Sequence, residues 1–259
     1  MEFESSPEIP LTGGHMNDVV RVGDTVRRRL GPHSAAVHAL LKHLRRKGIG
    51  EVPEVLGIDE RGREVLRYFE GVPALSEDPA VLWSDDTLAA AGRLLRRFHN
   101  AQAGLELAPD VEWSLIGREP GGYQEVLCHN DFTPYNSICR DGRIVGMIDF
   151  DLVAPGSRAW DLAWTAVNWI PLFDPSDHPR ERPDPPESGR RLRLLCEAYG
   201  FEDRETLVST MLHRMEHSAM VGAQRLAAGD PWAVRTADHR PFWARAQAFI
   251  EANADELVR

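Results

Sequence analysis

Cysteine is scarce in this chain, and its thiols are placed where they cannot form a disulfide framework. Cys128, Cys139 and Cys196 are odd in number and show no CxxC spacing among the 259 residues. Secreted domains of small size depend on paired cysteines, so we expect a reducing, cytoplasmic compartment. The ten histidines are scattered and include no HExxH motif, which disfavours a zinc site.

Long hydrophobic runs are absent as well. The longest uncharged apolar stretch, Leu162–Phe173, is too short to span a bilayer and is interrupted by Asn168 and Pro171. Met1–Pro10 carries acidic residues instead of the basic segment and apolar run of a signal peptide. The sequence therefore predicts a protein that has no membrane partner.

The chain also lacks an excess of positive charge. The chain has 40 acidic and 30 basic side chains, and its formal net charge of −10 argues against a nucleic-acid or anionic-membrane surface. Its composition, 42% hydrophobic and 27% charged, is typical of a globular protein. At this length we expect one large domain or two small ones packed tightly together.

The N-terminal part of the chain has the pattern of strands with one helix. Alternating apolar residues and turn signals predict strands at 19–22, 25–28, 54–58 and 63–69. Apolar residues at helical spacing predict one helix, which Ser34 caps and Gly48 ends. Glu70–Pro73 breaks this pattern, so we place a domain boundary between residues 1–70 and residues 71–259.

Beyond that boundary the pattern becomes mainly helical. The predicted segments are helices at 84–99, 161–169 and 190–259, a strand at 126–128, and a hairpin of 137–140 and 143–148. Ser84 caps the first of these helices, and breaks are expected in the last segment near Gly200 and Gly229. Residues 171–187 contain six prolines and are expected to form a loop. The layout is a small strand-rich lobe followed by a larger helical one.

The chemistry is concentrated in two short motifs around the predicted hairpin. Residues 129–136 read HNDFTPYN, and residues 148–151 read IDFD. Asp149 and Asp151 are two positions apart, so they share a face if the strand is extended. Carboxylate and amide oxygens are hard ligands that suit Mg²⁺, which also binds phosphates and keeps some of its waters. The two motifs therefore indicate a magnesium and phosphate site.

This paired pattern resembles the catalytic and metal loops of protein-kinase-like phosphotransferases, which read H-x-D-x-x-x-x-N followed by D-F-x. The HND and DFD forms, together with AWDLA at 159–163, are similar to the aminoglycoside phosphotransferase and choline kinase family. The resemblance extends over residues 13–173. It implies an α+β, two-lobed kinase-like fold, in which an antiparallel-sheet lobe with one main helix binds nucleotide and a helical lobe binds the acceptor.

The resemblance also implies roles for individual residues. Asp131 would accept or orient the proton of the substrate hydroxyl, while Asn136 and Asp149 would hold Mg²⁺ against the nucleotide phosphates. Three further residues would support the metal or brace the loop: His129, Asp151 and Asp161. For these three, local hydrogen bonding is the favoured interpretation.

The N-terminal lobe departs from the family pattern. Residues 11–17 lie where the family has its phosphate-covering loop but contain no GxGxxG or Walker A motif. No lysine stands on the third strand, so we expect Arg28, or alternatively Arg27, to bind the phosphates in its place. No glutamate lies in the predicted helix to pair with that residue. Phe69 and Glu70 stand in the family's hinge position, where backbone groups would meet the adenine edge.

Together these observations predict a Mg²⁺-dependent enzyme that transfers the γ-phosphoryl group of ATP, or GTP, to a hydroxyl of a small molecule. An aminoglycoside-type antibiotic is the leading acceptor by resemblance, and choline, another amino alcohol, a macrolide or a biosynthetic intermediate are alternatives. A non-catalytic binding or immunity protein with the same fold is the main rival, motivated by the missing lysine–glutamate pair. A protein kinase is disfavoured by the DFD segment and by the lack of an APE sequence after it.

Overall fold

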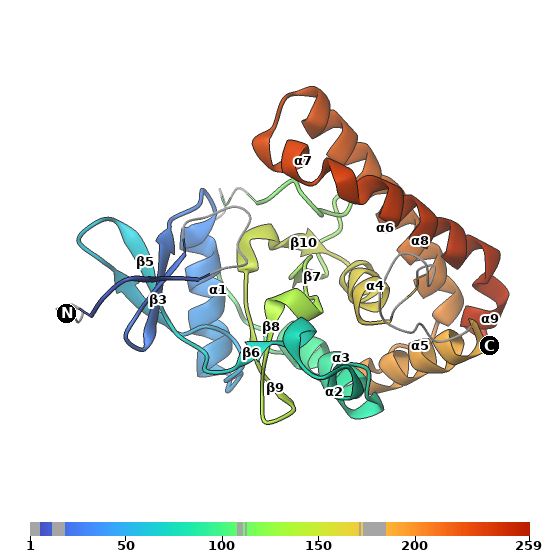
Figure 1. Ribbon diagram of the computed structural model, residues 1–259, viewed down its shortest axis with the longest axis horizontal. Coiled ribbons are helices and arrows are strands. Elements are labelled where there is room, and N and C mark those ends of the chain that lie inside the picture. The colour runs from blue at the N-terminus through green and yellow to red at the C-terminus, as the bar shows by residue number, and fades with distance from the viewer. Residues whose placement is uncertain (1–5, 12–18, 108–110, 112, 171, 173–184) are drawn as a thin grey trace.

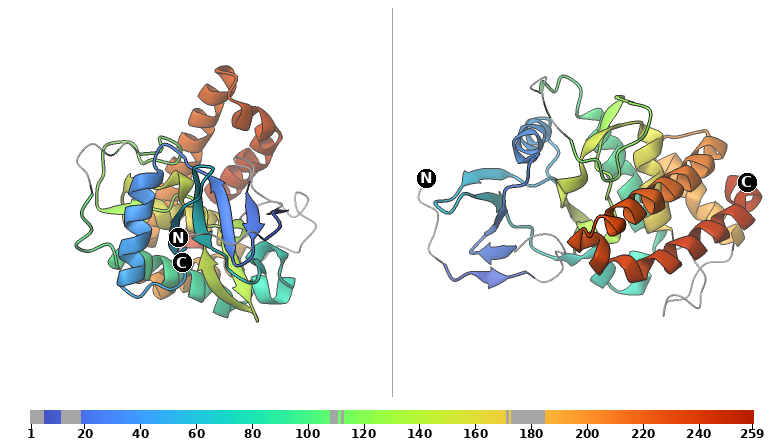
Figure 2. Two further views of the ribbon diagram at one scale, coloured as in Figure 1. Left: turned by 90° about the vertical axis from the view of Figure 1, so that its left-hand side faces the viewer. Right: turned by 90° about the horizontal axis from the view of Figure 1, so that it is seen from above.

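The computed structural model describes residues 6–11, 19–107, 111, 113–170, 172 and 185–259. Two lobes follow one another along its long axis, with the N-terminal sheet and α9 (Ala254–Val258) at opposite ends (Figure 1, Figure 2). The predicted loops at 11–17 and 171–187 fall mostly outside the described residues. Cys128, Cys139 and Cys196 are free thiols, and all three are buried.

The N-terminal lobe is an antiparallel five-stranded sheet with one main helix. The strand order is β1-β2-β3-β5-β4. The bounds are β1 Ile9–Pro10, β2 Val20–Val22, β3 Thr25–Arg29, β4 Val55–Ile58 and β5 Arg63–Arg67. In the β3–β5 ladder Val26 stands opposite Leu66, and Arg28 stands opposite Glu64. This register therefore sets an arginine and a glutamate side by side in the middle of the sheet.

Helix α1 (Ser34–Arg46) covers this sheet with its apolar side, on which Val37, Leu40, Leu41 and Leu44 are buried. The helix confirms the predicted segment, but the prediction that Ser34 caps it is wrong. His33 is the N-cap and offers no side-chain cap, while the Ser34 hydroxyl accepts a hydrogen bond from the amide of Gly31 at 2.9 Å. The serine therefore closes the preceding turn instead of satisfying the free amides of the first helical turn.

Two small sheets connect the lobes. Strands β6 (Val72–Pro73), β8 (Ser137–Arg140) and β9 (Arg143–Met147) form the first, in the order β6-β8-β9. Strands β7 (Val126–Cys128) and β10 (Ala154–Gly156) form the second. The predicted strand and hairpin are both present, and the two sequence motifs lie in the connections between these strands.

The C-terminal lobe is built from helices around a common apolar core (Figure 1). Their bounds are α2 Pro79–Leu82, α3 Asp85–Asn100, α4 Arg158–Trp169, α5 Pro185–Tyr199, α6 Arg204–Ala227, α7 Pro231–Arg235 and α8 Arg240–Ala252. Ser84 caps α3 by accepting from the amide of Thr87, as expected. Helix α4 begins earlier than predicted, at Arg158, because Ser157 caps it. No helix in the described ranges is long and apolar enough to cross a membrane.

Helix α5 and the terminal helix α9 approach closely at a glycine, which gives a test of the packing. A β-carbon on Gly189 would overlap the carbonyl oxygen of Glu256, whereas one on Gly222 in α6 would meet no atom within 4 Å. We therefore expect Gly189→Ala to lower the free energy of unfolding by about 1–3 kcal/mol through overpacking. Gly222→Ala is the matched control and should raise it by about 0.5–1 kcal/mol. Denaturant unfolding of both variants measures this, and equal effects would contradict the close α5–α9 contact.

Candidate functional site

The first motif forms the connection between β7 and β8, and the strand ends place its polar side chains together. Asn130 adopts a left-handed backbone conformation with φ of 66°, which turns the chain sharply after the buried strand. A short 3-10 turn at Pro134–Asn136 then leads into β8. The turn brings Asn136 back toward Asp131, although the two residues are five positions apart.

The Asp131 carboxylate is held by one donor on each oxygen. The Asn136 amide nitrogen donates to Oδ2 at 2.7 Å, and the Trp164 indole nitrogen donates to Oδ1 at 3.3 Å. Burial raises the pKa of Asp131 to about 7, and the neighbouring Asp149 carboxylate adds to the rise. A carboxylate with a raised pKa and a fixed orientation is suited to accept a proton from a bound hydroxyl.

Asn136 presents its amide in a defined direction. Its nitrogen donates both to the Asp131 carboxylate and to the Asp131 carbonyl oxygen, the latter at 2.9 Å. Since the nitrogen is used in this way, the amide oxygen is the atom available to ligate a cation. Tyr135, which precedes it, is 67% exposed and takes no part in holding the carboxylate.

The second motif follows β9, where the chain turns out of the small sheet. Asp149 has φ of 65° and precedes a 3-10 turn at Phe150–Leu152. Its side chain is 43% exposed, and the surrounding protein together with Asp151 raises its pKa above the ordinary aspartate value. Asp149 therefore lies close to a second carboxylate, whose charge adds to the effect of burial on its pKa.

Arg28 on β3 reaches across from the N-terminal lobe to this pair. Its guanidinium lies 3.3 Å from Asp149 and 2.8 Å from Asp151, and its Nε donates to Glu64 at 2.5 Å. Burial opposes its charge, but Asp151 and Glu64 raise the pKa of Arg28 above its ordinary value. Of the two predicted alternatives, Arg28 is the one at the site, since Arg27 pairs with Asp59 at 3.7 Å.

The glutamate that sequence reasoning sought in the helix is supplied by the neighbouring strand. Glu64 on β5 is 1% exposed and binds both Arg28 and His38 of α1, whose Nε2 lies 2.5 Å from its carboxylate. Burial acts against the carboxylate, but the His38 hydrogen bond and Arg28 hold the pKa of Glu64 below its ordinary value. Helix α1 therefore contacts the arginine through a histidine and a strand glutamate rather than through a glutamate of its own.

The donor set around Asp149 fits a hard divalent cation. Asn136 and Asp149 offer oxygens, and burial, with a neighbouring carboxylate as the second cause, raises the pKa of both Asp131 and Asp149, so that a bound cation would stabilise their ionised forms. Among the described residues no group of three His, Cys, Asp or Glu side chains is arranged to hold a metal unaided. A Mg²⁺ ion here would thus depend on phosphate and water for its remaining ligands, as Mg²⁺ commonly does.

His129 is fully buried and links the two motifs. Its Nδ1 accepts from the Asp131 amide at 3.2 Å, so the proton resides on Nε2, which lies 3.1 Å from the Ile148 carbonyl oxygen. Burial lowers the pKa of His129 to about 4, which keeps the ring neutral and Nδ1 free to accept. Through these contacts His129 holds the first motif against the second.

Protonation of His129 gives an expected pH dependence of stability. Between about pH 6.5 and pH 4 the unfolded chain binds a proton at this residue that the folded protein does not. The free energy of unfolding should therefore fall as the pH drops through that window, by about 3 kcal/mol from this residue. His129→Gln should show a flatter dependence in urea unfolding at pH 7, 6, 5 and 4. The same slope in both proteins would contradict the assignment.

Asp161 on α4 binds the backbone at the start of the loop between β7 and β8. Its buried carboxylate accepts from the amides of His129 and Asn130, at 2.7 and 2.8 Å, and from His99 Nε2 at 3.0 Å. Burial acts to raise its pKa, but the hydrogen bond and charge of His99 hold the pKa of Asp161 below the ordinary value. Tyr199 in turn contacts His99 Nδ1 at 2.7 Å, so the loop is tied to both α3 and α5.

The two residues predicted to form the hinge, Phe69 and Glu70, follow strand β5. The Phe69 ring packs on Gly146 of β9, where a β-carbon would come within 2.9 Å of the ring. The Glu70 side chain is largely exposed and lies 3.8 Å from Arg21. No side-chain contact therefore ties Glu70 to Asp131 or Asp149 in the described part of the chain, and its predicted role rests on its backbone.

Several residues at the site were not anticipated. Four of them stand out by their contacts: His38, Glu64, Trp164 and Arg214. A glutamate followed by Val65 and Leu66 in a short strand is an available signal for His38 and Glu64, because a central strand rarely buries an acid without a cation. A tryptophan in an apolar helix is usually a core residue, but the indole nitrogen of Trp164 donates to Asp131.

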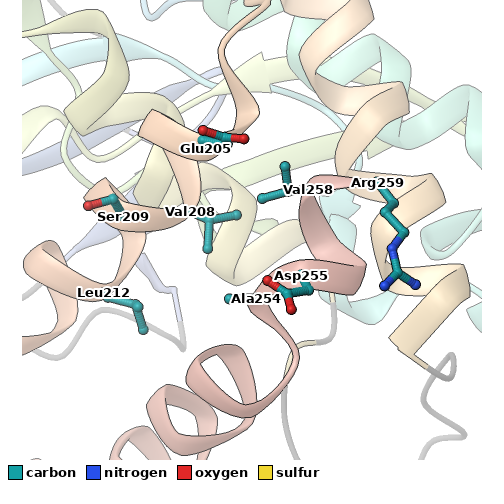
Figure 3. A pocket seen from close by; sticks show the side chains of 8 residues that line it. All are labelled: Glu205, Val208, Ser209, Leu212, Ala254, Asp255, Val258 and Arg259. Atoms are coloured by element: carbon teal, nitrogen blue, oxygen red, sulfur yellow. The ribbon is translucent and has the colours of Figure 1, made fainter.

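Two cavities of the helical lobe lie away from these residues. One, of about 490 Å³, is lined by residues of α6 and α9, among them Glu205, Leu212 and Val258 (Figure 3). A second, of about 480 Å³, is lined by Arg96, Arg158 and Tyr199, among others. Neither is lined by Asp131, Asn136 or Asp149.

Comparison with known proteins gives the family. The model of the phosphotransferase enzyme family matches residues 8–115 and 112–206. The trifolitoxin immunity protein of Rhizobium leguminosarum bv. trifolii is 35% identical over 245 residues, which cover 92% of this chain and 90% of that protein.

Solved structures share the fold at lower identity. A choline/ethanolamine kinase family protein from Mesorhizobium loti has a TM-score of 0.63 at 22% identity and covers 98% of this chain and 92% of its own. Spectinomycin phosphotransferase in complex with ADP and spectinomycin has a TM-score of 0.60 at 11% identity and covers 95% and 93%. The fold is thus the expected two-lobed, kinase-like α+β fold, and the chain belongs to the phosphotransferase enzyme family.

Proposed function

We propose that this phosphotransferase transfers the γ-phosphoryl group of ATP, or GTP, to a hydroxyl group of a small molecule with the help of Mg²⁺. The observation that supports this most directly is the arrangement of Asp131 between two donors, next to the Asp149 carboxylate. The site residues carry the chemistry of positioning and charge compensation on which phosphoryl transfer depends.

Each residue has a role in this proposal. Asp131 accepts the hydroxyl proton, and Asn136 and Asp149 hold the metal, with Asp151 nearby. When bound, Mg²⁺ compensates the charge of the phosphate oxygens. Arg28 adds positive charge from the other lobe, and its planar fork suits phosphate oxygens.

The two lobes divide the substrates in this proposal. Residues 1–70 bind the nucleotide, with the backbone around Phe69 and Glu70 facing its base. Residues 71–259 hold the acceptor. A cytoplasmic protein without nucleic-acid or membrane partners fits the net charge of −10 and the free thiols.

Only the similarity to solved structures suggests which class of acceptor to test. Structures with this fold include a spectinomycin phosphotransferase and a choline/ethanolamine kinase family protein, so aminoglycoside-type antibiotics and amino alcohols are the first acceptors to test. An aminoglycoside acceptor would make this protein an antibiotic-resistance enzyme. Acidic side chains of the helical lobe are candidates for binding a cationic acceptor; among them, Glu187 pairs with Arg190 and Glu216 is exposed on α6. Residues 174–184 lie outside the described part.

The test is transfer of labelled γ-phosphate from ATP and GTP to a panel of aminoglycosides, amino alcohols and a small-molecule cell extract. Labelling of a small molecule that requires Mg²⁺ and is abolished by EDTA supports the proposal. Labelling of proteins but not small molecules would refute the acceptor class. Mass spectrometry of the product then identifies the modified hydroxyl.

A second candidate function follows from the name of a relative. The 35%-identical protein is a trifolitoxin immunity protein, so this chain could protect a cell by binding a toxic compound without modifying it. The two candidates differ in one measurement. Binding alone predicts no phosphorylated product from any compound that the protein retains, whereas phosphoryl transfer predicts a product whose mass is increased by one phosphoryl group.

A further inference from the structure

Arg214 on α6 is a buried cation directly behind the candidate catalytic loop. The residue is 1% exposed and lies beyond residue 206, where the match to the family model ends. Burial lowers the pKa of Arg214 to about 10, so the side chain is charged at neutral pH. In the described part of the chain its guanidinium forms no ion pair and donates instead to neutral oxygens.

All but one of these oxygens belong to the residue before Asp131. Arg214 donates to the Asn130 side-chain oxygen at 3.0 Å and to the Asn130 carbonyl at 2.9 Å, with a third contact to the Trp160 carbonyl at 3.2 Å. Asp161 accepts from the Asn130 amide on the other side. A buried anion thus holds the N–H side of Asn130, and a buried cation holds its C=O side.

This clamp bears on a residue in a left-handed backbone conformation. Asn130 has φ of 66°, a conformation that asparagine adopts more readily than most residues and that contacts on both sides of Asn130 hold in place. The peptide between Asn130 and Asp131 has its oxygen bound by Arg214 and its N–H bound by His129 Nδ1. The backbone direction at Asp131 is therefore set from both ends.

The same arginine also contacts the group that holds the Asp131 side chain. Its guanidinium lies 4.9 Å from the Trp160 ring centroid and 5.1 Å from that of Trp164, within the range of cation–π attraction. Trp243 of α8 packs against Trp164 with ring centroids 5.3 Å apart. Trp164 is thereby fixed between two neighbours while its indole nitrogen donates to Asp131.

We propose that Arg214 is a positioning residue for phosphoryl transfer, because it fixes both the backbone of the Asn130–Asp131 peptide and the indole that orients the Asp131 carboxylate. This inference rests on the proposed function. A hydrophobic residue of similar volume would remove the desolvation cost of a buried charge, so stability alone does not account for an arginine here. Its donors form the fork that a carbonyl and an amide oxygen require, and lysine cannot reproduce that fork.

The experiment compares Arg214→Lys and Arg214→Met with Leu207→Ala, a core substitution on the same helix. Arg214→Lys should lower kcat by about 10²-fold while the KM for nucleotide changes by less than about twofold, because misplacement of a reacting group reduces turnover rather than binding. Arg214→Met should do at least as much. Leu207→Ala should lower the Tm and leave kcat unchanged at temperatures where it is folded. Wild-type kcat in folded Arg214→Lys, or the same kcat loss in Leu207→Ala, would overturn the proposal.

A second readout does not depend on activity. In ¹⁵N-labelled protein the indole N–H signal of Trp164, assigned with Trp164→Phe, should shift and broaden in Arg214→Lys, whereas that of Trp169, which donates to the Phe132 carbonyl, should stay in place. If neither indole signal moves in Arg214→Lys, the inference is overturned. If the wild-type protein transfers no phosphate to any acceptor, the proposed function fails, and the indole signals still decide whether Arg214 positions the loop.

Discussion

Asp131→Asn is expected to lower kcat by about 10²–10⁴-fold, the range contributed by a positioned general base. The amide is nearly isosteric with the carboxylate but cannot accept the hydroxyl proton. It also places an NH₂ group opposite either the Asn136 amide nitrogen or the Trp164 indole nitrogen, both of which donate. The acceptor hydroxyl then loses both its proton acceptor and its orientation.

The control for this prediction is Asp141→Asn. Asp141 lies in the turn of the neighbouring hairpin with φ of 51°, a conformation that asparagine tolerates, and its side chain is exposed. Turnover is measured by transfer of labelled γ-phosphate, nucleotide affinity by calorimetry, and folding by thermal unfolding. We expect Asp131→Asn to keep the Tm and nucleotide affinity of the wild type. Asp141→Asn should keep the wild-type turnover, nucleotide affinity and Tm. Turnover near that of the wild type in Asp131→Asn would remove this residue from the mechanism.

Arg28→Met is expected to reduce both stability and activity. It removes the guanidinium that pairs with Glu64, which is 1% exposed, and the same guanidinium's ion pairs with Asp149 and Asp151. Removing one partner from a buried ion pair costs about 3–5 kcal/mol, so the free energy of unfolding should fall by that amount. Since Arg28 also joins the lobes, kcat/KM for nucleotide should fall by at least about tenfold.

Two further variants separate the charge of Arg28 from its shape. Arg28→Lys keeps the charge but cannot bind Glu64, Asp149 and Asp151 together, so we expect it to recover part of the stability and less of kcat/KM. Arg29→Met on the same strand changes an exposed side chain and should behave as the wild type. Urea unfolding and steady-state kinetics measure both quantities. If Arg28→Met and Arg29→Met are equally stable, Arg28 is not the charge partner of these carboxylates.

Elements with strong local signals were predictable from the sequence. The helices carried apolar residues at regular spacing, Ser84 preceded a clear helix start, and residues 137–140 and 143–148 had the pattern of a hairpin. The HND and DFD motifs were recognisable because their residues are close together in sequence. The two-lobed fold followed from that pattern, and the family and fold comparisons confirm it.

Cross-strand and interhelical partners were harder to find. The Arg28–Glu64 pair depends on the register of two strands 36 residues apart, which no local pattern reports. Arg214 approaches Asn130 across 84 residues, and its α6 neighbourhood shows only ordinary helical spacing. The partner of Arg28 was expected in the helix for the same reason. The structure places that partner, Glu64, on the adjacent strand β5.

Some expectations about ends of elements were wrong for local physical reasons. Ser34 was expected to cap a helix, but its hydroxyl is engaged by the Gly31 amide. Helix α4 was expected from Asp161 and begins at Arg158, because Ser157 accepts from the Trp160 amide. Glu187 was expected in a loop and lies in α5. In each case a short-range hydrogen bond or helix extension outweighed the residue-type signal.

The position of Arg214 has a consequence for synthesis on the ribosome. Chains are made from the N-terminus and their parts fold as they emerge. Asp131, Asn136 and Asp149 emerge early, but the arginine that binds the Asn130 carbonyl emerges more than 80 residues after that asparagine, since the two are 84 positions apart. A nascent chain that ends before α6 therefore holds every reacting group of the proposed mechanism and lacks this part of the clamp. Completion of the site is thus delayed until the helical lobe is nearly finished.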